Sequence, residues 1–259
     1  LLKDKGIKKG DGIFILSEAE KNSLNLTNDE LEIIKPYYTT KELKRYYGTN
    51  KNKYWIIYSD INVRKNINKY PNIKRHLDKF QEIITSNNKP YGLHCARNKN
   101  FFEDKKIISL RKTRIPNFTY TDFPCYVSQT FFVIKPDDID MKYLTGLLNS
   151  KVIYFWLFFK GKKQGDQLQI DKEPLLQIPL IKPEDENIIK YIANRVDAII
   201  QASQTLENCQ LPNQIDFYKN LIKSRENEIN QKIYDLYNLS DDDKMEIEKV
   251  WGNNVVCEK

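Results

Sequence analysis

The chain has 259 residues, a formal net charge of +7, and 40% hydrophobic and 12% aromatic residues, which is enough apolar material for one large folded domain or two small ones. Its longest apolar run, Val152–Phe159, has eight residues, so a membrane-spanning helix of about 20 residues is excluded and no membrane partner is expected. The four cysteines lie far apart and only two histidines are present. The composition therefore predicts reduced thiols in a cytoplasmic protein, with no metal site and no disulfide framework.

The charge is unevenly distributed along the chain. Residues 1–183 carry 33 basic and 20 acidic side chains, a net charge of +13, whereas residues 184–259 carry 9 and 15, a net charge of −6. A concentrated basic excess favours a nucleic-acid partner. We therefore expect two domains: a basic, β-rich body over residues 1–183 that binds DNA, and an acidic helical hairpin with a C-terminal helix over residues 184–259. Because the chain begins in patterned sequence without Met, we expect it to be part of a longer protein.

Short elements are predicted over the first hundred residues. Hydrophobic patterning and turn residues indicate a strand at 13–16, a capped helix at 28–35, a central strand at 54–58 and an amphipathic helix at 70–84. The first strand follows a glycine-rich turn that carries Lys8 and Lys9, which are candidates for phosphate contact. Two lysines in a turn are also compatible with a plain solvated surface.

A strand at 105–114 ends in a basic cluster, Arg111, Lys112 and Arg114. Aromatic residues follow the cluster, and a further strand is predicted at 126–134. Basic residues interleaved with aromatic ones suit phosphate contact together with stacking on bases. A core strand with a charged edge explains the same pattern equally well. The aromatic residues in question are Phe118, Tyr120, Phe123 and Tyr126.

The segment 141–183 is the most distinctive of the chain. Apolar residues at helical spacing predict one buried helix over 141–159, followed by a polar loop at 160–167 and a short apolar strand before Pro183. A rigid apolar anchor that carries a basic, glycine-containing loop is suited to contact a polyanion. Glutamine amides can read adenine in a bidentate manner, and lysines can hold phosphates. The alternative is a plain surface loop. The candidate DNA-binding residues of this loop are Lys162, Lys163, Gln164 and Gln167.

The C-terminal part is predicted to be helical. Amphipathic patterns over 188–202 and 217–236, joined by a short linker, predict an antiparallel helical hairpin that packs on the buried helix at 141–159. Ser240 is expected to cap a third helix.

Catalytic motifs are absent from the sequence. The chain has no Walker loop, no HExxH and no GxSxG, so no catalytic residue is predicted. Asp78 together with Glu103-Asp104-Lys105 imitates the spacing of a metal-dependent nuclease, but such spacings arise readily by chance in a chain with 30% charged residues.

The order of several short motifs resembles a known family. The motifs are Gly6-Ile-x-x-Gly, Glu32-Ile-Ile-Lys-Pro36, Tyr70-Pro-x-Ile-x-x-x-Leu77, Lys106-Ile-Ile, Phe131-Phe-Val-Ile, Tyr143-Leu-x-Gly-Leu-Leu-Asn-Ser-Lys151, Ile178-Pro and Ile233-Tyr-Asp-Leu-Tyr-Asn-Leu-Ser240. Together they resemble the TaqI-like C-terminal specificity, or target-recognition, region of adenine-N6 DNA methyltransferases and fused restriction-modification enzymes.

The resemblance implies an α+β fold, with an irregular, mostly β recognition body followed by a C-terminal helical hairpin. It also implies sequence-specific recognition of double-stranded DNA, next to a methyltransferase catalytic domain in the same parent chain. That domain carries a loop for S-adenosylmethionine and an Asn-Pro-Pro-Tyr motif, and this chain has neither. We therefore expect no cofactor and no methyl transfer in this chain. The alternatives are an RNA-binding or protein-interaction module on the same fold, or a nuclease domain.

Overall fold

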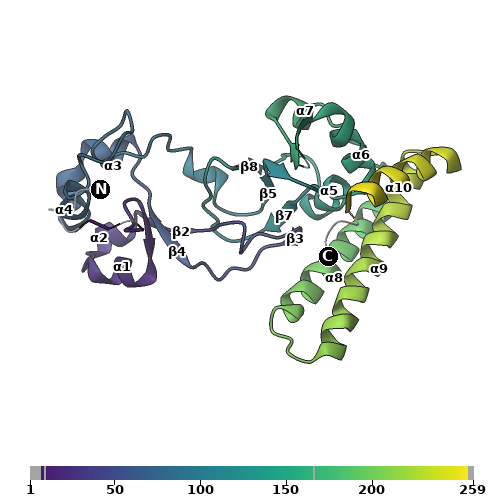
Figure 1. Ribbon diagram of the computed structural model, residues 1–259, viewed down its shortest axis with the longest axis horizontal. Coiled ribbons are helices and arrows are strands. Elements are labelled where there is room, and N and C mark those ends of the chain that lie inside the picture. The colour runs from purple at the N-terminus through teal and green to yellow at the C-terminus, as the bar shows by residue number, and fades with distance from the viewer. Residues whose placement is uncertain (1–6, 9, 166, 256–259) are drawn as a thin grey trace. The chain divides into compact units, whose positions relative to one another are not determined.

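The computed structural model describes residues 7–8, 10–165 and 167–255, and the chain divides into two compact units (Figure 1). The first unit contains the described residues up to Thr39, Asn50–Glu103 and Phe123–Val127. The second contains Thr40–Thr49, Asp104–Asp122 and the described residues from Ser128 onward. Both units combine helices with small sheets, so the predicted α+β class is confirmed. The functional division at residue 183 stays a prediction.

The first unit is built on a three-stranded antiparallel sheet in the order β1-β4-β2. The predicted central strand is confirmed, because β4 (Tyr54–Ile57) lies between β1 (Ile15–Ser17) and β2 (Ile34–Tyr37). A buried cluster that includes Leu16 and Ile73 joins the sheet to the helices at 61–65, 67–69 and 71–78. The described part of the unit has four α-helices and two 3-10 helices. These helices are α1 (Glu18–Ser23), α2 (Asn28–Leu31), α3 (Ile61–Lys65), η2 (Ile67–Lys69), α4 (Pro71–Asp78) and η3 (Lys99–Phe101).

Two predicted helices of this unit are shorter than expected. The helix predicted over 28–35 ends at Leu31, because residues 34–37 pair with β4 instead. The helix predicted over 70–84 ends at Asp78. Glu30 joins the two, since its buried carboxylate accepts hydrogen bonds from the backbone N–H groups of Thr27, Asn72 and Ile73 at 2.7–3.1 Å. It thereby supplies the acceptors that the N-terminus of α4 requires.

The second unit contains two sheets. A four-stranded sheet has the order β3-β7-β5-β8, in which β3 (Tyr46–Tyr47) is parallel to β7 (Phe118–Thr121) and the other pairs are antiparallel. The remaining strands of this sheet are β5 (Lys106–Leu110) and β8 (Phe131–Ile134). A three-stranded sheet has the order β6-β10-β9 and consists of β6 (Lys112–Thr113), β10 (Gln167–Gln169) and β9 (Lys162–Gln164).

The single helix predicted over 141–159 is wrong, because the structure has two: α5 (Met141–Leu148) and α6 (Lys151–Lys160). Between them, the Asn149 side chain donates to the Phe118 carbonyl at 2.7 Å and accepts from the Phe118 N–H at 3.1 Å. Ser150 adopts an extended conformation and caps α6 by accepting from the Ile153 N–H. The Leu-Leu-Asn-Ser-Lys segment of the family resemblance therefore connects two helices, and its buried Asn149 amide pairs with the backbone at the first residue of β7.

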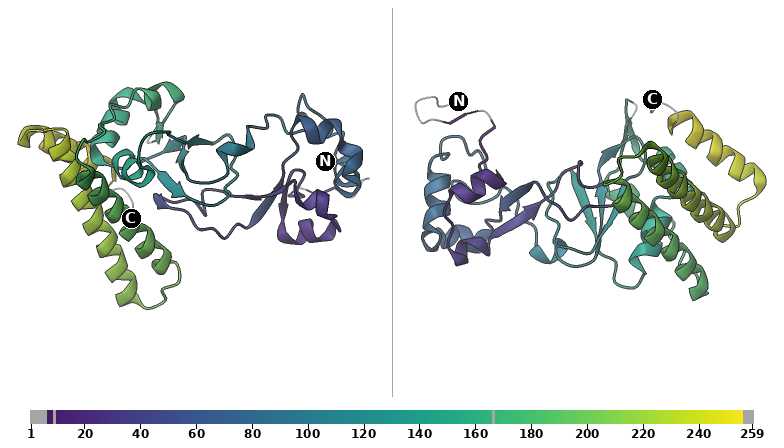
Figure 2. Two further views of the ribbon diagram at one scale, coloured as in Figure 1. Left: turned by 180° about the vertical axis from the view of Figure 1, so that it is seen from behind. Right: turned by 90° about the horizontal axis from the view of Figure 1, so that it is seen from below.

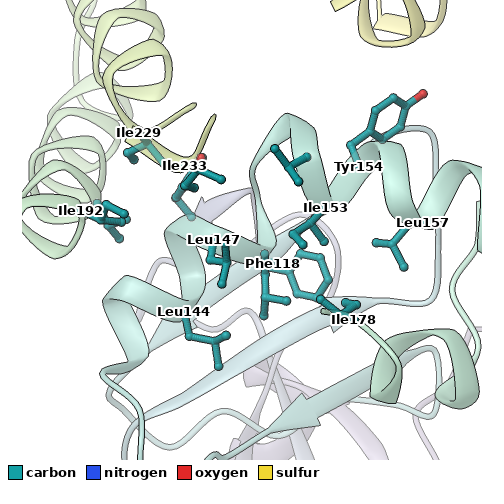
Figure 3. Close-up of a cluster of buried hydrophobic side chains, with 14 of the residues drawn as sticks. Phe118, Leu144, Leu147, Ile153, Tyr154, Leu157, Ile178, Ile192, Ile229 and Ile233 are labelled. Carbon is teal, nitrogen blue, oxygen red and sulfur yellow. The ribbon is translucent and has the colours of Figure 1, made fainter. Parts of the chain in front are cut away.

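The C-terminal helical hairpin is confirmed. Both views in Figure 2 show α8 (Glu186–Leu206) and α9 (Pro212–Leu236) side by side. Their apolar faces pack on α5, where a Cβ atom added to Gly146 would lie 2.6 Å from Ile192 Cγ2. Figure 3 shows the shared core, to which α5, α6, α8 and α9 contribute buried side chains. After the hairpin, α10 (Asp241–Val255) packs on α6, and the third helix is also confirmed.

The apolar strand predicted before Pro183 is absent from the described residues. The structure has a short helix there, α7 (Lys172–Leu176), followed by irregular backbone that buries Ile178. Proline at 174, 179 and 183 explains this outcome, since proline removes the N–H groups that a strand needs. Among the described residues, no helix has the length and apolar character that a membrane crossing requires.

Candidate nucleic-acid interface

Two basic segments that lie 50 residues apart in the sequence meet in the β6-β10-β9 sheet. Strand β10 pairs with β6 through Leu168 opposite Thr113 and Gln169 opposite Lys112. It pairs with β9 through Gln167 opposite Gln164. The predicted polar loop is therefore a β-hairpin. It ends in a turn at Gly165, which has φ +64° and no atom within 4 Å of the position that a Cβ would take.

The strand register divides the predicted site residues between the two faces of this sheet. Directly opposed residues of an antiparallel pair share a face, and successive residues alternate. Lys112 and Lys162 are each opposed to Gln169 of the central strand, so the three residues lie on one face, which Gln167 shares; we call it the outer face. Lys163 is opposed to Leu168, which is buried, so it lies on the inner face. The two neighbouring lysines therefore present their charges to different surroundings.

An aspartate organises the charges of the outer face. Asp171 lies 3.5 Å from the Lys162 ammonium and 3.7 Å from the Arg111 guanidinium, and it accepts a hydrogen bond of 2.9 Å from the Gln169 amide. The Gln169 hydrogen bond, together with Lys162 and Arg111, lowers the pKa of Asp171. The Arg111 guanidinium also lies over the Phe132 ring at 4.9 Å. Asp171 thus pairs with two cations of this region, Lys162 and Arg111.

The inner face meets the end of α6. The Lys163 ammonium lies 3.5 Å from the centroid of the Phe158 ring, a cation–π contact. Beside it is a pocket of about 220 Å³. Its lining combines predicted site residues with two aromatic residues of α6 that the sequence patterns did not single out. The lining consists of Arg114, Tyr154, Phe158, Lys163, Gly165, Gln167 and Leu168, so the pocket also reaches Gln167 of the outer face.

The tight connection between α6 and β9 depends on Gly161. A Cβ atom at this position would lie 2.6 Å from the Leu157 carbonyl oxygen, so only glycine allows the chain to leave the helix here. The hairpin is consequently anchored directly to the buried helix, as the sequence led us to expect.

Two predicted residues, Lys8 and Lys9, are not brought to this sheet by described contacts, and a third, Gln164, is placed there by its backbone alone. Lys8 is exposed in the first unit, in a turn where its N–H donates to Asp11 at 2.7 Å. Lys9 and the side chain of Gln164 lie outside the described residues, although the Gln164 backbone pairs with Gln167. The roles of all these residues in binding stay predictions.

The aromatic residues after the basic cluster belong to the core. Phe118, Tyr120 and Tyr126 are buried, so the interpretation that these rings stack on bases is wrong for them, and a core strand with a charged edge is the correct alternative. Phe123 is partly buried, and its ring lies 5.5 Å from that of Tyr38.

The nuclease-like acids make ordinary structural contacts. Asp78 accepts hydrogen bonds from Tyr91 and Gln81, and Glu103 accepts one from Tyr126. Within the ranges that the structure describes, no group of three or more His, Cys, Asp or Glu residues could hold a metal ion. His76 is buried and bonded to the Ile13 carbonyl at 2.9 Å, and burial lowers its pKa. Cys95, Cys125 and Cys209 are free thiols, and Cys257 lies outside the described residues.

Comparisons with known proteins agree with these features. The family model described as the TaqI-like C-terminal specificity domain matches residues 35–180, more than half of the chain. The type II methyltransferase M.HindII of Haemophilus influenzae is 26% identical over 212 residues, which cover 70% of this chain and 40% of that protein. M.HincII, also of Haemophilus influenzae, is 26% identical over 222 residues, covering 73% and 44%. The chain thus spans less than half the length of these relatives.

A solved structure shares the fold. It is that of the type IIL restriction-modification enzyme MmeI in complex with DNA, with a TM-score of 0.66 and 15% identity. The match covers 89% of this chain and 31% of that one.

Proposed function

The chain belongs to the family of TaqI-like C-terminal specificity domains, and from this premise we propose that it recognises a specific sequence in double-stranded DNA. In this proposal it is the target-recognition part of a larger adenine-N6 DNA methyltransferase or fused restriction-modification enzyme. Two observations support this assignment: its relatives are named type II methyltransferases, and MmeI, which shares its fold, was solved in complex with DNA. S-adenosylmethionine and the methyl transfer are assigned to a catalytic part of the parent protein, outside these residues.

The outer face of the β6-β10-β9 sheet carries the proposal. A two-stranded β-ribbon fits the major groove of B-DNA, and the β9–β10 hairpin is such a ribbon with an open turn. Lys112 and Lys162 would contact phosphates and set the register. The amides of Gln167 and Gln169, with Gln164 at the turn, would read base edges, since a glutamine amide matches the N6 and N7 atoms of adenine.

Lys162→Ala and Gln167→Ala separate the two roles. Both variants of this chain are titrated with duplexes chosen from a random library, at several salt concentrations. Lys162→Ala should weaken all sequences alike and reduce the slope of log K against log salt by about one unit. Gln167→Ala should leave the slope unchanged and relax the preference at one base pair, by about 1–3 kcal/mol. Lys190→Ala on α8, where the lysine pairs with Glu186, is the matched control for loss of a surface charge.

The outcomes decide between the candidate functions. Duplex binding that is independent of salt would contradict the proposal. A duplex RNA that competes as well as DNA would contradict it too, and would favour the RNA-binding alternative. The assignment to adenine can be tested only with the parent protein. Incubated with S-adenosylmethionine and duplex DNA, the parent protein should produce N6-methyladenine. This chain alone should bind no S-adenosylmethionine in a calorimetric titration, and micromolar binding would overturn the division of roles.

A further inference from the structure

A pocket of the first unit is lined by a buried hydroxyl group that the described contacts leave unexplained. The pocket has a volume of about 200 Å³ and is lined by residues that follow β4, by the start of α3 and by the segment 88–96. Ser59 belongs to this lining and is 1% exposed, and its hydroxyl has no hydrogen-bond partner among the described residues. A buried hydroxyl normally has a partner, and a molecule bound in the pocket can supply it.

The guanidinium group of Arg64 lines the same pocket and is held in place by the chain around it. Its Nη1 atom donates to the Asn88 side-chain oxygen, and the Asn88 amide donates in turn to the carbonyl groups of Leu93 and His94 at 2.9 and 3.1 Å. A Cβ atom at Gly92 would lie 2.9 Å from Arg64 Cδ, so the absence of a side chain there makes room for the arginine. The Nε and Nη2 atoms of Arg64 donate to no described residue, so they remain for an acceptor from outside.

Asp60 also lines the pocket, but its charge is compensated within the protein. One carboxylate oxygen accepts hydrogen bonds from the N–H groups of Asn62 and Val63 at 2.9 and 3.0 Å, and the other lies 3.5 Å from the Lys99 ammonium. Residues 60–69 and 88–99, which surround the pocket, hold no other acidic residue and six basic ones, and such an excess attracts anions. The basic residues are Arg64, Lys65, Lys69, Lys89, Arg97 and Lys99.

The donors of the pocket are suited to an oxyanion. An arginine fork matches two oxygens of a phosphate group, and the Ser59 hydroxyl can donate to a third. The pocket is larger than one water requires, since a water molecule occupies about 30 Å³ in the liquid. None of the described lining residues is aromatic, so a nucleobase would find no ring on which to stack. The other walls are aliphatic side chains, those of Ile61, Leu93 and Ala96.

We infer that this pocket binds one phosphate group of the DNA backbone, with the Arg64 guanidinium and the Ser59 hydroxyl as donors. The inference rests on the proposed function and adds to it a contact in the first unit, whereas the outer face belongs to the second. Phosphate contacts set the register and orientation of a protein on the duplex and carry no sequence information. The pocket therefore contributes to the affinity for DNA and leaves the base preference to the outer face.

Arg64→Gln and Ser59→Ala test the inference. Both variants and the unaltered chain are titrated with duplexes in which each phosphate in turn is replaced by an uncharged methylphosphonate. Each variant should bind normal DNA about tenfold more weakly, as expected for hydrogen bonds to a charged group, and should keep the base preference. Arg64→Gln should also reduce the slope of log K against log salt by about one unit, which Ser59→Ala should not do. One replacement that weakens binding by the unaltered chain should have little further effect in either variant, because that contact is already lost.

Three controls separate the loss of this contact from other effects. Lys65→Gln removes the neighbouring positive charge of α3 and should keep the full effect of that phosphate replacement. Ser23→Ala removes an exposed hydroxyl of α1 and should not change DNA binding. Thermal unfolding of Ser59→Ala should occur at an unchanged or higher temperature, because the variant removes a buried hydroxyl without a partner. Weaker DNA binding by this variant can then not be ascribed to misfolding.

The outcomes distinguish this inference from the proposed function. If the unaltered chain binds DNA with the expected salt dependence, but Arg64→Gln and Ser59→Ala bind equally well, the inference fails and the proposed function stands. Binding by the unaltered chain that is independent of salt would overturn both. Saturable binding of inorganic phosphate or adenosine monophosphate that requires Arg64 and Ser59, without any effect of the variants on DNA binding, would overturn the inference in favour of a small phosphorylated ligand.

Discussion

At the scale of single residues, Asp171 restrains the cations of the outer face. Its carboxylate contacts Lys162 and Arg111, and these contacts compete with DNA phosphates for the same charges. Asp171→Asn removes the competing charge while it keeps an acceptor for the Gln169 amide. We expect this variant to bind all duplexes more tightly and to steepen the salt slope by about one unit for each additional phosphate that the released cations neutralise. Titration against cognate and altered duplexes measures both effects, and weaker binding would show that Asp171 itself contacts DNA.

The buried carboxylate of Glu30 leads to a prediction about the stability of the first unit. Burial raises its pKa, but the hydrogen bonds from Thr27, Asn72 and Ile73 outweigh burial and lower it below the ordinary value of 4.5. A carboxylate with a lowered pKa in the folded state stabilises the fold above its unfolded-state pKa, and this contribution is lost as the pH falls through the folded-state pKa. Replacing this carboxylate should therefore lower the free energy of unfolding at neutral pH, and this effect should shrink in acid.

Glu30→Gln should lower the free energy of unfolding at pH 7 by about 1.5–3 kcal/mol, the usual effect of losing hydrogen bonds to a charged group. Urea unfolding at a series of pH values measures it, with Glu32→Gln, an exposed neighbour, as the control. The difference between the unaltered chain and Glu30→Gln should shrink below about pH 4.5. A difference that is constant from pH 7 to pH 3 would mean that the charge of Glu30 contributes nothing.

At the scale of elements, the approach of α5 to α8 depends on the absence of a side chain at Gly146. A Cβ there would lie 2.6 Å from Ile192 Cγ2 and 3.2 Å from Val196 Cγ2, both buried. Gly146→Ala should therefore lower stability by about 1–3 kcal/mol through overpacking, in spite of the better helix propensity of alanine. Gly252→Ala is the matched control in α10, since its Cβ would meet no atom within 4 Å; it should raise stability by about 0.5–1 kcal/mol. Thermal unfolding of both variants with the same change in Tm would contradict this account.

These elements show which parts of the fold could be predicted from the sequence alone. Strand β4 follows from its run of aromatic and β-branched residues, and helices α8 and α9 follow from local periodicity, because each helix buries one face. The break between α5 and α6 could not be found in this way, since the cause is a pair of hydrogen bonds from Asn149 to Phe118, 31 residues earlier. The β-hairpin at 162–169 was likewise hidden, because its polar residues resemble a loop until β6 pairs with β10. The candidate residues were identified, but their division between two faces depends on that register.

At the scale of the whole molecule, the helical hairpin completes the second unit. Its α9 helix supplies the carboxylate of Glu226, which pairs with the Arg45 guanidinium at 2.5 Å, and the Asn230 side chain, which accepts from the Lys151 N–H at 2.8 Å. The first pair compensates a largely buried charge, and the second caps the N-terminus of α6. We therefore expect the helix that anchors the basic hairpin to require the acidic end of the chain, so that residues 1–183 would not fold independently of residues 184–259.

A truncation after Pro183 tests this dependence. It would expose the face of α5 around Gly146 and leave Arg45 without its carboxylate partner, and an uncompensated buried charge alone costs about 3–5 kcal/mol. That is a large share of the stability of a typical domain, about 5–15 kcal/mol. We expect residues 1–183 to show no cooperative thermal unfolding of the second unit and no salt-dependent binding of DNA.

An insertion of Gly-Ser-Gly after Gln210, in the short connection between α8 and α9, is the control and should keep both properties, because this connection is largely exposed. A truncated chain that is monomeric, unfolds cooperatively as a whole and binds DNA as the complete chain does would show that the hairpin is dispensable, and that the recognition body extends no further than residue 183.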